Sequence, residues 1–212
     1  MSEDATGSGR ADADAETDHI GAAPTRLAAS QVRRLRRIVD AAYRLAEEGG
    51  FEGVRLRDVA EASGVALGTL YRYFRSKEDI LVFVLAEQLD AFEQAVTSHP
   101  PEGATARERA RGVFGMLTRA LTRRPHLAQA LLRAVSAGEP ETKEKVAAFH
   151  LRVSRLVLDA LRGPEPATER LEAAAAILQQ VWFASLVGWT GGLHDAKTVL
   201  AHVDDAAALL LT

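Results

Sequence analysis

Apolar residues recur at helical spacing along almost the whole chain, and Gly or Pro interrupts them between segments. In residues 31–48, for example, Leu35, Ile38 and Leu45 share one face, and Gly49 follows. Such spacing is typical of amphipathic helices, whereas no segment alternates in polarity as a half-buried strand does. The pattern predicts an all-α fold of about nine helices.

Short local motifs mark where these helices start. Ser76 with Asp79 has the spacing of a capping box, as does Thr105 with Glu108. Pro125 suits the first position of a helix. The expected helices cover 31–48, 56–62, 66–74 and 76–97, then segments opening at 105, 125 and 140, and finally 168–190 and 196–211.

Composition removes several classes of protein. The chain of 212 residues is 47% hydrophobic, which is enough to bury a core, and it contains no cysteine. Disulfide frameworks and thiolate sites are therefore excluded. The first 25 residues contain no apolar run of the signal-peptide type, so a cytoplasmic location is expected. Glu172 and Gln179 interrupt the most apolar stretch, residues 171–189, so no membrane span is expected.

Charge divides the chain into three parts. Residues 1–25 carry a net charge of -5 and almost no large apolar side chains, and are expected to form a disordered acidic tail. Residues 26–77 carry +5, which indicates an anionic polymer as partner. Residues 78–212 carry -3 and most of the apolar helices. We therefore expect a nucleic-acid-binding domain at 26–77 and a second, helical domain at 78–212; the family resemblance given below implies that this second domain binds a ligand and dimerises.

The stretch VRLRDVAEASGVALGTLYRYFRSKED, residues 54–79, combines cations, aromatics and a glycine turn. Two short helices joined at Gly64 form a helix-turn-helix, whose second helix can enter the major groove of DNA. Leu70 and Phe74, four residues apart, are expected to hold that helix onto the first helix of the domain. The alternative is an ordinary solvated surface with half-buried tyrosines.

Residues 33–80 resemble the DNA-binding domain of TetR-family transcriptional regulators, most specifically in GTLYRYFRSKED. The resemblance implies an all-helical homodimer, a divergent ligand-binding domain, and a palindromic double-stranded operator that is released when a ligand binds. It places Tyr71, Tyr73 and Lys77 at phosphates, and Gly68 and Thr69 at the groove. The residues expected to contact DNA are Arg34, Arg36, Arg37, Arg55, Leu67, Gly68, Thr69, Tyr71, Arg72, Tyr73 and Lys77.

The chain departs from the family pattern at two places. Ala66 and Leu67 replace a common Ser-Lys pair before Gly68, which removes a capping hydroxyl and a cationic contact. Readout of the groove is therefore expected to depend more on apolar contact. Arg55 replaces the Ser or Thr that often opens the second helix, so the geometry of phosphate binding there cannot be copied from the family.

A narrower resemblance involves three segments, VALGTLYRYFRSK, RRPHLAQALLRA at 123–134 and VWFASLVGWT at 181–190. They are similar to the actinobacterial repressors of cholesterol catabolism, which implies a steroid-acid CoA thioester as effector. Another apolar ligand is the alternative, as for a regulator of efflux or stress genes. The residues expected to contact the effector are Phe83, Phe114, Leu117, Leu121, Phe149, Leu178, Trp182 and Leu186.

The segment 168–190 is apolar on two opposite sides, and such a helix is expected to be buried all round. The stripe with larger side chains contains Leu171, Ala175, Leu178, Trp182, Leu186 and Trp189, and suits a core or a pocket. The stripe with smaller side chains suits close approach of the same helix in a second protomer, unless both stripes belong to the core of one chain. The expected dimer contacts are Ala173, Ala176, Gln180, Ala184 and Val187.

Catalysis finds little support in the sequence. The histidines lack metal-ligand spacing, and no nucleophile elbow, P-loop or dinucleotide-binding motif is present. We therefore expect no enzymatic activity, no metal and no cofactor. A DNA-binding architectural protein without a ligand cavity is the remaining alternative from another class.

Overall fold

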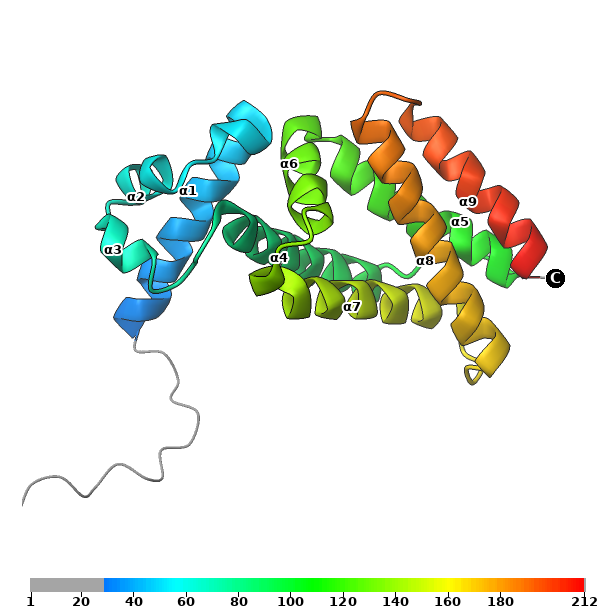
Figure 1. The fold of residues 1–212 in the computed structure, drawn as a ribbon. Helices are drawn as coiled ribbons and strands as arrows, with labels where there is room; N and C mark the ends of the chain where they lie inside the picture. The colour runs from blue at the N-terminus through cyan, green and yellow to red at the C-terminus, as the bar shows by residue number, and fades with distance from the viewer. Residues whose placement is uncertain (1–28, 212) are drawn as a thin grey trace, which may run out of the picture.

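The computed structural model describes residues 29–211, and every regular element within them is helical (Figure 1). This confirms the all-α prediction. The tail expected at 1–25 lies outside the described residues. The helices are α1 (Ala29–Gly53), α2 (Leu56–Ser63), α3 (Leu67–Leu70), α4 (Lys77–Ser98), α5 (Ala106–Thr122), α6 (Pro125–Ser136), the short 3₁₀ turn η1 (Pro140–Thr142), α7 (Lys143–Arg162), α8 (Glu169–Thr190) and α9 (Ala196–Leu210).

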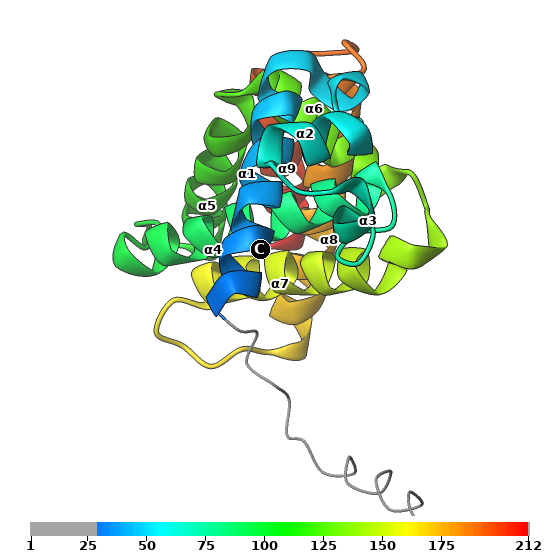
Figure 2. The same ribbon diagram turned by 90° about the vertical axis from the view of Figure 1, so that its left-hand side faces the viewer.

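The first three helices form a small unit at one end of the molecule, seen face-on in Figure 2. Ile38 of α1, Val59 of α2 and Leu70 of α3 are fully buried where these helices meet. Gly64 ends α2 with the left-handed conformation that was expected, at φ 64°. The unit has the helix-turn-helix arrangement predicted from the sequence.

The remaining helices build a larger bundle. The helix α8 packs against α7 and α9, while α5 packs against α7 and α9, and α4 against α6 and α7. The helix α6 has a second partner, because it also packs along α1 (Figure 1). It is therefore the main bridge between the two units. The domain boundary expected at 77 and 78 falls in the first turn of α4 and stays a prediction.

Two helices differ in length from the expectation. The helix α1 continues past Gly49 to Gly53, with a break at Gly50, whose φ of 61° an L-residue rarely adopts. The helix α3 ends at Leu70 instead of residue 74, although Tyr73 and Phe74 both donate backbone hydrogen bonds to the Leu70 carbonyl. A tightened last turn thus replaces regular α-helix, and it carries Phe74 into the core.

The predicted capping motifs are only partly regular. Thr105 and Glu108 form a complete capping box at the start of α5. Ser76 caps α4 by accepting a hydrogen bond from the Asp79 amide at 3.1 Å. The Asp79 carboxylate accepts its backbone hydrogen bond from Arg75 rather than from Ser76, also at 3.1 Å.

Within one chain the helix α8 is buried on one side only, and burial of its other side by a second protomer stays a prediction. Its large stripe lies in the core, where Leu178 and Leu186 are fully buried. Its small stripe is exposed because no other described part of the chain covers it. By length and composition α8 is also apolar enough to span a membrane, as a core helix can be, and here it packs against α6, α7 and α9.

Candidate DNA-binding surface and effector cavity

The helix-turn-helix presents its polar side chains outward while its apolar ones fix it in place. Leu70 is fully buried and Phe74 is 2% exposed, and the Phe74 ring packs edge-on against Phe83 at 5.5 Å between centroids. Tyr71, next to Leu70, is 52% exposed. The α3 helix is therefore held by its apolar residues, and its opposite side faces solvent.

The sequence departs from the family pattern at the N-cap positions of α2 and α3. Arg55 and Ala66 occupy the N-cap positions, and neither side chain caps its helix. An added Cβ at Gly68 would meet no atom within 4 Å, so the approach to the start of α3 is open. A DNA backbone or base edge can therefore come close to this end of α3.

The residues expected to contact DNA fall into two groups by exposure. The exposed group consists of Arg36, Arg37, Arg55, Gly68, Tyr71 and Arg72. The partly buried group consists of Arg34, Leu67, Thr69, Tyr73 and Lys77. All of them lie on α1, on α2 and α3 with their flanking turns, or at the start of α4, and their contacts with DNA stay predictions.

Lys77 already has partners within the chain. Its ammonium lies 3.8 Å from the centre of the Phe51 ring, donates to the Phe51 carbonyl at 3.3 Å, and is 3.6 Å from the Glu52 carboxylate. Arg133 of α6 contacts the same ring and carboxylate, at 4.3 Å and 2.8 Å. Lys77 therefore helps to join α4 to α1, and a phosphate would have to share it with Glu52.

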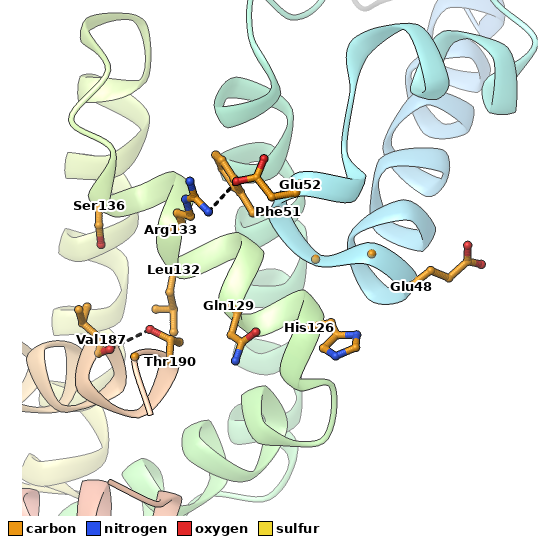
Figure 3. Close-up of a pocket in the computed structure, with 13 residues that line it drawn as sticks. Glu48, Phe51, Glu52, His126, Gln129, Leu132, Arg133, Ser136, Val187 and Thr190 are labelled. Carbon is orange, nitrogen blue, oxygen red and sulfur yellow. Dashed lines mark hydrogen bonds and ion pairs between the residues drawn. The ribbon is translucent and has the colours of Figure 1, made fainter. Parts of the chain in front are cut away.

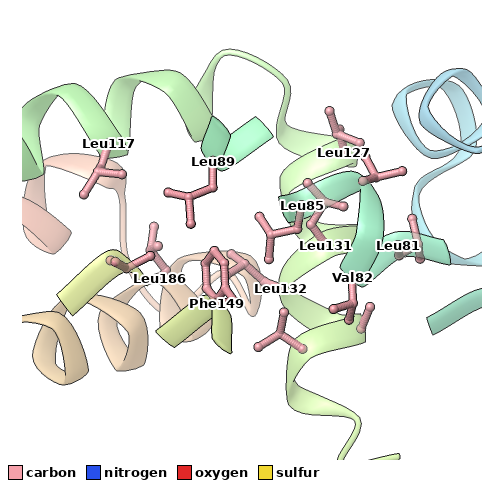
Figure 4. Close-up of a cluster of buried hydrophobic side chains, with 14 of the residues drawn as sticks. Leu81, Val82, Leu85, Leu89, Leu117, Leu127, Leu131, Leu132, Phe149 and Leu186 are labelled. Carbon is pink, nitrogen blue, oxygen red and sulfur yellow. The ribbon is translucent and has the colours of Figure 1, made fainter. Parts of the chain in front are cut away.

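An apolar cavity lies inside the larger bundle. Its walls come from α4, α5, α6, α7 and α8, and its volume is about 90 Å³. Figure 4 shows several of its leucines around Phe149, within the buried cluster. The residues that line it are Leu85, Gln88, Leu89, Phe92, Leu117, Ala120, Leu121, Arg124, Leu127, Ala128, Leu131, Phe149, Val153 and Trp182.

Half of the residues expected to contact the effector line this cavity, namely Leu117, Leu121, Phe149 and Trp182. The other expected residues do not line it. Phe114 lies behind Trp182 at 5.8 Å between ring centres, and Phe83 contacts Phe74 near α3. Leu178 and Leu186 are fully buried in the core. Spacing on a helix wheel identifies an inward side chain, but it does not separate one facing a cavity from one packed in the core.

Polar groups at the cavity are few. The indole N–H of Trp182 donates to the Thr118 hydroxyl at 3.0 Å, and both side chains are buried. This bond holds the Trp182 ring in place. Gln88 and Arg124 supply the other polar side chains, and Arg124 is the one charged residue among the described residues that line the cavity.

A second hollow, of about 730 Å³, opens between the end of α1, α6 and the end of α8 (Figure 3). Glu48, Glu52, His126, Gln129 and Arg133 give it polar walls, and it is open to solvent. None of the residues expected to contact the effector lines it. An apolar effector is better matched by the cavity among α4–α8, whose walls are mostly hydrocarbon.

The exposed side of α8 carries all the residues expected at a dimer interface. Ala173, Ala176, Gln180, Ala184 and Val187 are exposed. Larger apolar side chains extend the same kind of surface, since Ile177 is 47% exposed and Leu209 of α9 is 81% exposed. Exposed apolar side chains that gather on one face of a protein can mark an interaction site.

Sequence reasoning missed the residues that α4 and α6 give to the cavity, among them Leu89, Leu131 and Arg124. Leu131 and Arg124 lie within the segment RRPHLAQALLRA, which was noted only as a resemblance. The available signal was an arginine directly before the helix-opening Pro125, followed by Leu127 and Leu131 at helical spacing.

Comparisons with known proteins agree with this architecture. Residues 38–83 match the family described as bacterial regulatory proteins, tetR family, and residues 103–210 match the tetracyclin repressor-like C-terminal domain. The chain is 35% identical over 182 residues to the HTH-type transcriptional repressor KstR of Rhodococcus jostii strain RHA1. The aligned segment covers 86% of this chain and 84% of that protein.

Two solved structures share the fold. A TetR transcriptional regulator from Rhodococcus sp. RHA1 has a TM-score of 0.77 and 30% identity, over 86% of this chain and 98% of that one. Thermus thermophilus FadR, a TetR-family repressor in complex with lauroyl-CoA, has a TM-score of 0.67 and 23% identity, over 84% and 93% of the two chains. Both halves of this chain thus match one family, and the chain belongs to the TetR family of bacterial transcriptional regulators.

Proposed function

We propose that the chain is a dimeric repressor of lipid or steroid catabolism genes that leaves its operator when an apolar effector fills the cavity among α4–α8. The observation that carries the proposal is the position of α6. Its residues Leu127, Ala128 and Leu131 line the cavity, while the same helix packs along α1 of the DNA-binding unit. A ligand in the cavity therefore touches the helix on which the DNA-binding unit rests.

DNA recognition is proposed to follow the helix-turn-helix. One α3 helix reads a half-site, and a two-fold dimer sets two such helices one helical turn apart, roughly 34–36 Å, or a multiple of that. The operator should therefore be an inverted repeat. Gly68 and Thr69 would approach base edges, and the exposed cations and tyrosines would contact phosphates. A protein with a DNA operator as its target would act in the cytoplasm, where bacterial DNA lies.

The dimer is proposed to form through α8 and α9. The stripe of small residues on α8 lets another helix approach closely, and Ile177 and Leu209 add apolar area beside it. Two such helix pairs would form a four-helix bundle across the two-fold axis. This arrangement would bury the apolar side of α8 that a single chain leaves exposed.

The effector is proposed to be a CoA thioester of a steroid or fatty acid. Apolar walls suit the hydrocarbon body, and the sequence resembles the repressors of cholesterol catabolism and matches KstR over most of its length. A structure of the same fold holds an acyl-CoA, so the fold can accommodate one. A regulator of efflux or stress genes that senses another apolar compound is the alternative.

Cavity size supports a mechanism of release. Sites for ligands of this size measure roughly 300–1,000 Å³. The cavity of about 90 Å³ must therefore widen, and a shift of the helices that form its walls would widen it. A ligand that binds only the widened state shifts the population toward it. Displacement of α6 would then change how α1 presents α3 to DNA.

Tryptophan emission and operator binding test this proposal together. Trp182 lines the cavity and Trp189 does not, so a Trp189→Phe protein reports the cavity alone. A steroid-acid CoA thioester should change the emission and release an operator duplex over the same concentration range, because effector and DNA are linked. Free CoA is the control.

The outcomes separate the alternatives. Equal response to any fatty acyl-CoA would remove the steroid assignment and keep the regulator. Emission changes without operator release would favour a DNA-binding protein whose ligand does not regulate it. No response to any lipid thioester would contradict the proposed effector class.

A further inference from the structure

Arg124 is shared between the cavity and the DNA-binding unit. It precedes Pro125 at the junction of α5 and α6, and it lines the cavity. Its Nε atom lies 2.6 Å from Oε1 of Glu47 on α1, and its guanidinium lies 5.7 Å from the centre of the Tyr43 ring. A single side chain thus connects the wall of the cavity with α1.

The surroundings of this ion pair allow it to be exchanged. The Arg124 side chain is 51% exposed and the Glu47 side chain 41%, and a pair exposed to this extent is only weakly stabilising. Burial raises the pKa of the adjacent Tyr43 hydroxyl, Arg124 lowers it and Glu47 raises it. The three groups therefore act on one another electrostatically. The guanidinium can turn to another anion without opening the core.

The lining of the cavity indicates which kind of anion Arg124 can bind in place of Glu47. Arg124 is the one charged residue among the described residues that line the cavity, and apart from Gln88 the rest of the lining is apolar, so the cavity orients an amphipathic molecule with the tail inside and the negative group at Arg124. Guanidinium groups bind carboxylates and phosphates through two parallel hydrogen bonds, which the Nε contact with Glu47 does not use fully.

We propose that Arg124 holds Glu47 when the cavity is empty and the anionic group of the effector when it is filled. This inference rests on the proposed function and adds a chemical class to it: an effector must carry a carboxylate or phosphate on its apolar body. Transfer of Arg124 to the effector leaves Glu47 of α1 without its partner. The effector thereby weakens a contact between α6 and the DNA-binding unit, in addition to widening the cavity.

Direct binding of dodecyl compounds tests the exchange. Laurate, lauroyl-CoA and dodecanol share one chain and differ in head group, and their binding is followed by emission of the Trp189→Phe protein and its variants. Arg124→Gln should weaken laurate or lauroyl-CoA binding at least about tenfold and leave dodecanol unchanged. Laurate sensitivity identifies the carboxylate as the recognised group, and sensitivity limited to lauroyl-CoA identifies the phosphates.

Two matched variants complete the test. Glu47→Gln removes the competing partner and leaves the cavity intact, so both anionic ligands should bind about twofold to fivefold more tightly. Arg123→Gln removes a neighbouring exposed charge that does not line the cavity, and should match the parent protein. Neither arginine change removes a cap, because Arg124 makes no side-chain cap and Arg123 caps α5 through its backbone N–H.

The results distinguish this inference from the proposed function. If Arg124→Gln binds laurate as tightly as the parent protein does, and also binds lauroyl-CoA as tightly, the exchange is overturned, whether or not the operator is released. Binding that depends on Arg124 without any release of operator supports the anion site and overturns the proposed repressor mechanism. Failure of all three dodecyl compounds to bind overturns the exchange as a property of fatty-chain anions, while the proposed function is decided separately by the steroid-acid CoA thioester.

Discussion

Lys145 of α7 forms an ion pair with the buried carboxylate of Asp79 at the start of α4. The other oxygen of Asp79 accepts a hydrogen bond from the Arg75 amide, in the turn that follows α3. Phe149, one helical turn after Lys145, lines the cavity. A second connection therefore runs from the cavity wall through α7 to the end of the DNA-reading segment.

Lys145→Met should destabilise the protein, because it leaves the Asp79 carboxylate buried with only one polar partner. We expect a loss of about 1–3 kcal/mol in the free energy of unfolding. Lys143→Met removes the same charge from an exposed position on α7 and should change stability little. Denaturant unfolding measures both, and equal stabilities would show that the ion pair contributes nothing.

Arg72→Ala should weaken binding to all DNA sequences alike. Arg72 is exposed beside Tyr71, so its loss removes a phosphate contact without disturbing the core. The slope of log affinity against log salt concentration is negative, and it should become less steep by about one unit. Arg155→Ala, which removes an exposed charge from α7, is the control. An unchanged slope for Arg72→Ala would remove this residue from the interface.

Lys77→Ala should combine two effects, because this lysine contacts Phe51 and Glu52 as well as its expected phosphate. We expect weaker DNA binding and a stability loss of about 1 kcal/mol from the lost cation–π contact. Measuring affinity at several salt concentrations and unfolding by denaturant separates the two effects. Lower stability with unchanged affinity would assign Lys77 a structural role alone.

Ala184→Arg should give a monomer that binds the operator weakly, since the added side chain points from the exposed stripe of α8. Ala147→Arg makes the same change at an exposed position on α7 and should leave the dimer intact. Sedimentation velocity reports the assembly state. A persistent Ala184→Arg dimer would place the interface elsewhere on the protein.

Asp204 of α9 should make stability depend on pH below neutrality. Hydrogen bonds from Arg111 and Arg107 of α5, both at 3.0 Å, hold the pKa of its carboxyl below the usual value. The stabilisation is therefore present above the unfolded-state pKa and is lost as pH falls through the lower folded-state pKa. Asp204→Asn should cost about 1 kcal/mol at pH 7 and reduce the acid dependence. Parallel pH profiles for the two proteins would contradict this role.

Local chemistry made much of the fold predictable. Thr105 with Glu108, Pro125 and Gly64 act within one or two helical turns, so their roles can be read from neighbouring residues. The two stripes of α8 were also predictable, because helical periodicity alone determines which side chains share a face. What periodicity could not supply was that one stripe remains uncovered, since that depends on where the other helices pack.

The cavity and its cation depended on contacts between distant segments. Glu47 and Arg124 are far apart in sequence, and no local pattern indicates that they meet. Phe114 and Leu117 are both buried on α5, yet of the two only Leu117 lines the cavity, while Phe114 packs against the Trp182 ring. The tertiary arrangement of the helices decides such differences.

The break at Gly50 has a consequence for engineering sensors from this protein. Phe51 and Glu52 follow this break and meet Arg133, while Glu47, just before the break, meets Arg124. A hybrid that receives new α2 and α3 helices for another operator, and retains residues 43–53, keeps the surface on which α6 rests. A hybrid that exchanges all of 29–77 inherits the proposed response of DNA binding to the effector only if its donor places acidic side chains opposite Arg124 and Arg133.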